Sequence, residues 1–176
     1  ASAKVDALFT FMPGGMGVGL VKQYRQAGLA DKIPVLSAFT VDESTLPAQQ
    51  DAAIGMFGGS NWAPNMDNPQ NKKFVAAYNA EFKRNPDMFS VGGYDGIRLI
   101  YEALKKTGGK TDGDALIEAM KGMKWESPRG PISIDPETRD IVQNIYIRKV
   151  EKVDGELYNV EFATFEAVKD SGKTKK

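Results

Sequence analysis

The sequence predicts an α/β fold, with a parallel sheet and crossover helices followed by a helical segment and a C-terminal β-hairpin. Three short apolar runs, at residues 5–12, 34–39 and 53–57, alternate with helical patterns, as is typical of a parallel sheet. Three more helical patterns then follow one another without a strand between them. Finally, Asp154-Gly155 separates two strand-like runs and is a strong hairpin signal.

The first apolar run predicts a buried strand that enters a tight turn at Pro13-Gly14-Gly15. Helical spacing of apolar residues follows, and Gly28 stands where a C-terminal cap belongs. Residues 34–39 predict a second buried strand. Residues 45–51 favour a short helix before the third strand at 53–57.

Residues 60–69 hold two prolines and four Asn or Asp residues, which predicts a connector. Within it, Asn68 before Pro69 is a typical N-cap followed by proline at the first helical position. Trp62 in this connector either covers part of a core or has a functional role, and the sequence alone leaves both open.

Three amphipathic helices are expected after the connector, with apolar residues about four apart. The first ends before Pro86, the second at Gly108-Gly109, and the third begins near Thr111. Without a strand to cover their apolar stripes, we expect the chain to self-associate or to pair with another segment. Beyond them, residues 131–136 predict an extended piece that leads to the hairpin, whose return strand covers residues 157–165.

Composition excludes several classes of function. The 23 Lys and Arg residues balance 23 Asp and Glu residues, so the basic face expected of a nucleic-acid-binding protein is not indicated. The absence of histidine and cysteine excludes a Ser-His-Asp triad, a thiol nucleophile and the usual nitrogen–sulfur zinc site. No two acidic residues form a persuasive acid–base pair, and we interpret Asp42 as a helix cap and Glu43 as its solvated neighbour. We therefore expect no catalytic residue, metal or cofactor.

A glycine-rich segment, Gly14-Gly15-Met16-Gly17-Val18-Gly19, follows a strand and opens a helix. It does not complete the dinucleotide-binding pattern, because Leu20 or Lys22 stands where the last glycine is required. Two interpretations remain. The glycines either let backbone N–H groups at the helix N-terminus approach a small ligand, or they serve only tight turning and close packing.

Several segments together resemble the type I periplasmic solute-binding proteins of ABC transporters, related to the leucine/isoleucine/valine-binding protein. The matching segments are residues 51–56, 67–69, 92–96, 102–109, 128–135 and 143–147. Each is weak alone, but their order and spacing extend over nearly the whole chain. The chain is similar to the C-terminal half of that family, so the resemblance implies a missing N-terminal half as partner.

The resemblance implies a protein of two α/β lobes that clamp a ligand between them, joined by three chain crossovers. It assigns residues 1–64 to a βαβ segment of the second lobe, 65–139 to a helical return through the first lobe, and 140–176 to a second-lobe hairpin and tail. The connector is then a hinge strand outside either core. Its candidate hinge residues are Trp62, Pro64, Asn65 and Asn68.

Two departures from the amino-acid-binding relatives bear on the ligand. Met16 stands where those relatives offer a tyrosine, and Phe39 where they offer a glutamate for the ligand ammonium. These replacements favour an aromatic or apolar carboxylic acid over a free amino acid. Because parallel strands end at the same edge, we expect the turn and the second strand end to form one wall of the site. The candidate ligand-binding residues are Pro13, Gly14, Gly15, Met16, Phe39 and Thr40.

The resemblance thus implies a periplasmic, non-enzymatic solute-binding component of an ABC uptake system, with a small-molecule solute and an ABC permease as partners. Two alternatives stay open at this stage. One is a ligand-sensing domain of a receptor or regulator, and the other is a nucleotide-dependent α/β enzyme.

Overall fold

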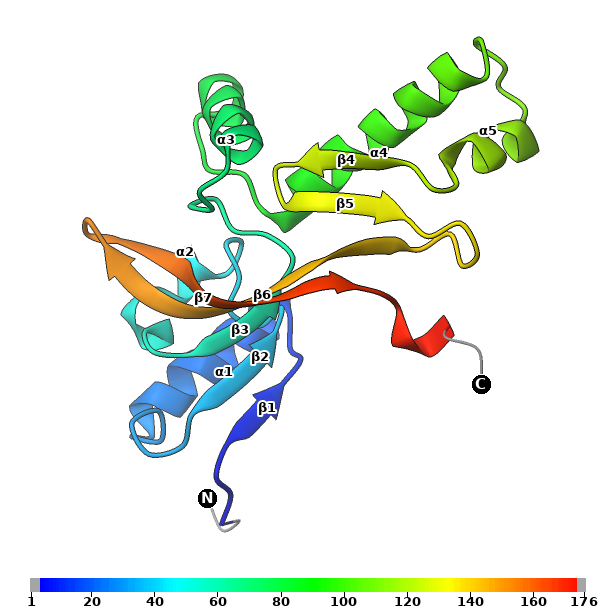
Figure 1. Ribbon diagram of the computed structural model, residues 1–176. Coiled ribbons are helices and arrows are strands. Elements are labelled where there is room, and N and C mark those ends of the chain that lie inside the picture. Colours follow the sequence, from blue (N-terminus) through cyan, green and yellow to red (C-terminus); the bar gives the residue numbers. More distant parts are fainter. Residues whose placement is uncertain (1–3, 174–176) are drawn as a thin grey trace. The chain divides into compact units, whose positions relative to one another are not determined.

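The computed structural model describes residues 4–173, which form two compact units (Figure 1). Residues 4–65 and 146–164 make the first unit, and residues 66–145 and 165–173 make the second. The chain therefore passes between the units three times, after Asn65, Ile145 and Thr164. The assignment of these segments to two lobes of a larger protein stays a prediction.

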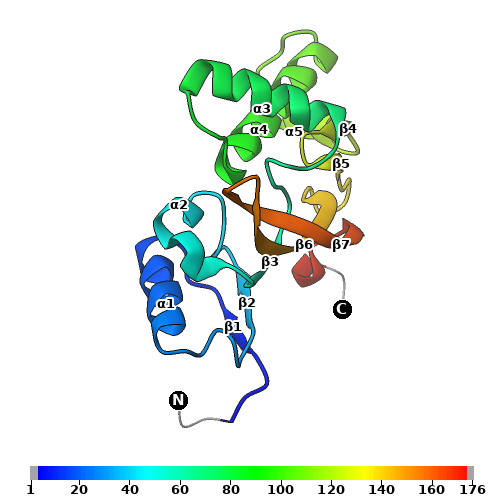
Figure 2. The same cartoon turned by 90° about the vertical axis from the view of Figure 1, so that its left-hand side faces the viewer.

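The first unit begins with the predicted strand–helix alternation. Its elements are β1 (Leu8–Thr10), α1 (Gly14–Gln26), β2 (Val35–Ala38), α2 (Leu46–Gln49), a 3₁₀ turn (Gln50–Ala53) and β3 (Phe57–Ser60). Strands β1, β2 and β3 are parallel, with Phe9 opposite Leu36 and Leu36 opposite Phe57. Figure 2 shows α1 and α2 on the same side of these strands. The expected parallel sheet with crossover helices is confirmed.

The core of the first unit lies where α1, α2 and the sheet meet. Its buried apolar side chains come from α1, β2, the loop after β2, α2, the 3₁₀ turn and the residues between it and β3, and the later part of β6 (Ile141–Val153). They are Val21, Tyr24, Val35, Val41, Leu46, Ala53, Met56 and Val150. Burial of these side chains, at about 1.5–3 kcal/mol for each large one, holds the strand ends in place.

The second unit contains three helices and two short strands. They are α3 (Pro69–Phe82), α4 (Met88–Lys106), α5 (Gly113–Met120), β4 (Lys124–Ser127) and β5 (Gly130–Ile134). Each helix has an N-cap side chain, since Asn68, Asp87 and Asp112 accept from backbone N–H groups of the first turn. Large apolar side chains stay exposed on these helices, namely Phe82, Phe89, Tyr94, Ile97, Ile100, Tyr101 and Ile117.

Strand β6 contributes to both units, because its first residues pair with β5 and its later residues pair antiparallel with β3. It returns as β7 (Glu156–Val168) through Asp154 and Gly155, which have φ angles of 50° and 88°. Two successive positive φ values are the geometry of a type I′ turn. The predicted C-terminal hairpin is confirmed.

Two strands differ from the sequence expectation. Residues 53–57 were expected to form the third strand, but β3 begins only at Phe57 and contains Gly58 and Gly59. Glycine has a low strand propensity, so the sequence pattern predicted the strand in the apolar residues that precede these two glycines. At Gly58 an added Cβ would lie 3.6 Å from Val41 Cγ2, so the small residue suits this crowded position. Strand β4 lay in a segment for which no strand was expected.

The turn after β5 is organised by the carboxylate of Asp135. Its Oδ1 accepts the N–H groups of Glu137 and Thr138 at 2.8 and 3.2 Å, and its Oδ2 lies 2.8 Å from Lys169 Nζ. The Lys169 hydrogen bond, helped by the two backbone N–H groups, lowers the pKa of Asp135 from 3.8 to about 2. A carboxyl group with a depressed pKa in the folded protein contributes stability above its unfolded pKa, and this is lost as pH falls through the folded value.

Asp135→Asn is therefore expected to lower the melting temperature at neutral pH and to have a much smaller effect near pH 2, where about half of the Asp135 carboxyl groups of the folded parent are protonated. In the variant, Lys169 has no ionised carboxylate to contact at any pH. In the parent, this carboxylate loses its charge only at low pH. Thermal unfolding followed by circular dichroism at both pH values measures the difference. The exposed Asp6 supplies the control Asp6→Asn. An Asp135→Asn deficit of equal size at both pH values would contradict the prediction.

Candidate functional site

The turn after β1 lies beside the end of β2, as the parallel register requires. Thr10 is opposite Ser37, and the backbone N–H of Met12 donates to Thr40 Oγ1 at 2.9 Å. Thr40 is fully buried, and its backbone carbonyl oxygen accepts a hydrogen bond from Gln49 Nε2 at 2.6 Å. The expected juxtaposition of these two loops is confirmed, whereas their role in ligand binding is not tested by it.

One glycine of the glycine-rich segment is required by close packing. A Cβ added at Gly17 would lie 2.0 Å from the carbonyl oxygen of Met12 and 3.3 Å from Thr40 Cγ2. Helix α1 therefore begins directly against the two strand ends, because residue 17 has no side chain. Gly14 has a φ of 68° at the start of the helix, a left-handed conformation that glycine adopts readily because it has no Cβ.

The N-terminus of α1 faces this turn without a side-chain cap. Pro13 occupies the N-cap position in extended conformation and makes no capping hydrogen bond. The first N–H groups of a helix have no partner within the helix, and they carry the positive end of its dipole. The N–H groups of Gly15 and Met16 are therefore suited to an anionic group such as a carboxylate.

Apolar side chains stand at the same edge of the sheet. The rings of Phe11 and Phe39 are 5.7 Å apart at an interplanar angle of 83°, an edge-to-face contact. Phe11, Met16 and Phe39 are 62%, 73% and 37% exposed, so their surfaces are accessible in this unit. Phe39 has a φ of 59°, which is unusual for a residue with a bulky side chain.

Phe11 is a functional candidate that sequence reasoning missed. It lies in the apolar run at residues 5–12, which was interpreted as a wholly buried strand. The strand is shorter than that run, and Phe11 lies beyond its last residue, Thr10. The signal that could have found it is its position two residues before the turn, where a strand of a parallel sheet ends at the site edge.

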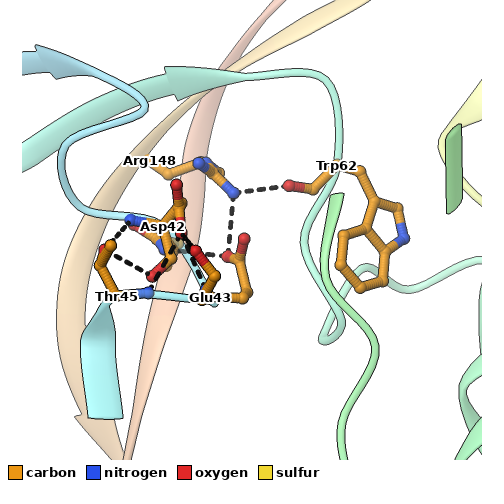
Figure 3. Close-up of polar contacts among 7 residues, drawn as sticks. Asp42, Glu43, Thr45, Trp62 and Arg148 are labelled. Carbon is orange, nitrogen blue, oxygen red and sulfur yellow. Dashed lines mark hydrogen bonds and ion pairs between the residues drawn. The ribbon is translucent and has the colours of Figure 1, made fainter. Parts of the chain in front are cut away.

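A buried ion pair lies at the far end of the loop after Thr40 (Figure 3). Arg148 on β6 donates from Nη1 to Glu43 Oε1 at 3.1 Å and to the carbonyl oxygen of Trp62 at 2.5 Å. Asn159 on β7 donates to the same Glu43 oxygen at 2.9 Å. The side chains of Arg148 and Glu43 are 2% and 8% exposed.

Burial raises the pKa of Glu43, and the positive charge of Arg148 opposes this increase. The interpretation of Glu43 as a solvated neighbour of a helix cap is therefore wrong. The other half of that interpretation is also wrong, because Thr45 holds the N-cap position of α2 and its side chain makes no capping hydrogen bond. Asp42 Oδ1 instead accepts from the N–H groups of Ser44 and Thr45 in the turn before α2.

The four predicted hinge residues lie where the chain first passes from one unit to the other. Trp62, Pro64 and Asn65 end the first unit's opening segment, and Asn68 caps α3 and donates to the carbonyl oxygen of Pro128 at 2.9 Å. Trp62 and Ala63 are 0% and 1% exposed, so the expectation that the connector belongs to no core is wrong at these residues. The large apolar surface of the Trp62 side chain favours burial in a core, and an exposed, flexible connector would leave that surface in water. The hinge role itself stays a prediction.

Two further features concern other kinds of site. Among residues 4–173, no group of three acidic, His or Cys side chains is placed to hold a metal ion. In the same part of the chain, no helix combines the length and apolar character needed to cross a membrane.

The first unit is an α/β arrangement in which the two loops lie at the carboxyl ends of the parallel strands β1 and β2. In open α/β sheets this is the edge at which ligands bind. The sequence profile described as "Periplasmic binding protein" matches residues 1–156, and the chain belongs to that family.

Individual relatives agree with this assignment. The chain is 43% identical over 173 residues to Leu/Ile/Val-binding protein homolog 6 of Brucella melitensis. This match covers 95% of this chain and 44% of the relative. It is 61% identical, with a TM-score of 0.89, to a solute-binding protein of an ABC transporter from Rhodopseudomonas palustris BisB5, solved in complex with 3,4-dihydroxybenzoic acid. That match covers 96% of this chain and 47% of the other.

A second solved structure, from Rhodopseudomonas palustris HaA2, is a solute-binding protein of an ABC transporter in complex with p-hydroxybenzoic acid. It is 45% identical with a TM-score of 0.92, covering 97% of this chain and 48% of the other. The chain thus spans about half the length of the curated relatives and solved structures that it matches.

Proposed function

We propose that this chain forms part of a periplasmic, non-enzymatic solute-binding component of an ABC uptake system, with an aromatic carboxylic acid as its solute. The observation that carries the proposal is the exposed Phe11–Phe39 pair beside the uncapped N-terminus of α1. Two relatives at 61% and 45% identity were solved with hydroxylated benzoic acids, and this supports the same ligand class here.

The proposed wall recognises both ends of such a ligand. The carboxylate accepts hydrogen bonds from the N–H groups of Gly15 and Met16, and such charge-assisted bonds contribute about 1.5–3 kcal/mol each. The aromatic ring lies against Phe39 and Phe11, where a favourable ring contact adds about 0.5–1.5 kcal/mol. The shape of the wall also depends on Pro13, Gly14 and Thr40. Phe39 has no carboxylate that could pair with the α-ammonium group of an amino acid.

The remaining partners follow from the family. The solute is passed to an ABC permease, and the N-terminal part of the binding protein supplies the opposite wall. The apolar side chains exposed on α3, α4 and α5 support pairing with such a segment or self-association in its absence.

Isothermal titration of the full-length protein tests the ligand class. We expect 4-hydroxybenzoate to bind at least about tenfold more tightly than leucine, since one favourable ring contact and the missing ammonium partner each favour it. Tight binding of leucine with no response to the aromatic acid would refute the proposal. Phe39→Glu is expected to shift the preference toward leucine.

A matched pair of variants tests the wall itself. Phe11→Ala should weaken 4-hydroxybenzoate binding by roughly three- to tenfold, the equivalent of one ring contact. Phe162→Ala removes one ring of a similar edge-to-face pair, with Phe57 at 5.8 Å, and should leave affinity unchanged. Equal effects of the two variants would place the ligand elsewhere.

A further inference from the structure

Arg148 holds together segments that are far apart in the sequence. From one nitrogen it donates to Glu43, 105 residues away, and to the carbonyl oxygen of Trp62, 86 residues away. Figure 3 shows its guanidinium between the loop that carries Glu43 and the segment that carries Trp62. The same carboxylate oxygen of Glu43 also accepts from Asn159 on β7, so both strands of the hairpin hold this loop.

The loop held in this way is the one that carries the proposed ligand wall. Glu43 lies three residues after Thr40 in this loop. Phe39 has a positive φ, which costs free energy for a residue with a Cβ. Such a conformation persists only where surrounding contacts fix it. On one side of Phe39 the Thr40 hydroxyl accepts from Met12, and farther along the loop the Glu43 carboxylate is bound by Arg148.

The other residues that Arg148 fixes lie near two passages of the chain between units. Trp62 comes three residues before the passage after Asn65, and Arg148 itself comes three residues after Ile145, where β6 enters the first unit. One guanidinium therefore joins the ligand-wall loop to residues that lie next to two of the passages.

The composition of this cluster argues against a purely stabilising role. Replacing a buried ion pair by apolar residues of similar size is often neutral or stabilising. Within the described residues, Glu43 Oε2 and Arg148 Nε are buried without a hydrogen-bond partner, so the pair is not arranged for maximal stability. In some proteins, buried polar or ionic groups instead specify one arrangement of the segments that they join.

We infer that Arg148, with Glu43, is a positioning residue that fixes the Phe39–Glu43 loop and the Trp62 end of the connector. The consequence for ligand affinity rests on the proposed function, whereas the positioning of the two segments does not.

Hydrogen exchange of the full-length protein tests the positioning without any ligand. In Arg148→Met, the amides of residues 39–45 and of residues 62 and 63 should exchange about tenfold faster or more, because their local opening becomes easier. The matched control is Val150→Ala on the same strand, which removes buried apolar contacts and no hydrogen bond of this cluster. Each variant is compared at the same interval below its own melting temperature.

The control separates positioning from general destabilisation. Faster exchange at residues 39–45 in Arg148→Met but not in Val150→Ala supports the inference, and the same pattern in both variants overturns it. If Arg148→Met does not fold, Glu43→Gln replaces it, since glutamine keeps the shape and one acceptor oxygen. Its effect should be smaller and confined to the same residues, and unchanged exchange there would also overturn the inference.

Affinity measurements then show whether the positioning matters for the ligand. In Arg148→Met the affinity for 4-hydroxybenzoate should fall about tenfold, and in Val150→Ala less than about twofold. A parent protein that binds no aromatic carboxylate contradicts the proposed function alone, because the exchange experiment still decides the positioning. Equal affinity in parent and Arg148→Met would overturn the link between Arg148 and the ligand wall.

Discussion

Arg148→Met is expected to lower the free energy of unfolding at pH 7 by about 3–5 kcal/mol, because it leaves the Glu43 carboxylate buried without its counter-charge. The variant also removes the donor to the carbonyl oxygen of Trp62. Urea unfolding of the parent and the variant measures the difference. The double variant Glu43→Gln/Arg148→Met removes both charges and should recover part of the loss.

The loss in Arg148→Met should depend on pH. Burial raises the pKa of Glu43 above its ordinary 4.5, and Arg148 opposes this in the parent, so without Arg148 the pKa rises further. A raised pKa in the folded protein contributes stability below the unfolded value, and this contribution is lost as pH rises through the folded value. The deficit of Arg148→Met is therefore expected to be smaller near pH 4 than at pH 7. An equal deficit at both pH values would show that the buried carboxylate is not its cause.

This ion pair also shows what sequence patterns do not contain. Acidic residues are usually solvated, and nothing near Glu43 in the sequence suggests otherwise. Its partners, Arg148 and Asn159, are 105 and 116 residues away and meet it only through the pairing of β6 with β3 and β7. Trp62 was equally hard to place, because prolines and asparagines around it predict a solvent-exposed connector.

Local chemistry was more informative at turns and helix ends. Asn68 before Pro69, Gly28 after α1 and Asp154-Gly155 each require one backbone geometry, and the structure has a cap or a turn at each. The juxtaposition of the first turn with the second strand end was also predictable, because parallel strands end at one edge. Phe11 was missed because an apolar run does not show where its strand ends.

Gly17→Ala is expected to be the most damaging change in the glycine-rich segment. The added Cβ would lie 2.0 Å from the Met12 carbonyl oxygen, and both the oxygen and the glycine belong to backbone that cannot move alone. Overpacking of this kind costs about 1–3 kcal/mol or more, against a gain of about 0.5–1 kcal/mol from alanine in a helix. We expect a net loss of about 2 kcal/mol, with weaker 4-hydroxybenzoate binding because the α1 N-terminus is displaced.

Gly19→Ala supplies the control two residues further along the same helix. A Cβ at Gly19 meets nothing within 4 Å, so only the helix propensity of alanine acts there. This variant should gain about 0.5–1 kcal/mol and bind the ligand as the parent does. Chemical unfolding and calorimetric titration of both variants test the close approach of α1 to the strand ends. Equal stability of Gly17→Ala and Gly19→Ala would show that the close contact at Gly17 does not affect the free energy of unfolding. It would also contradict the second interpretation of the glycines, that they serve tight turning and close packing.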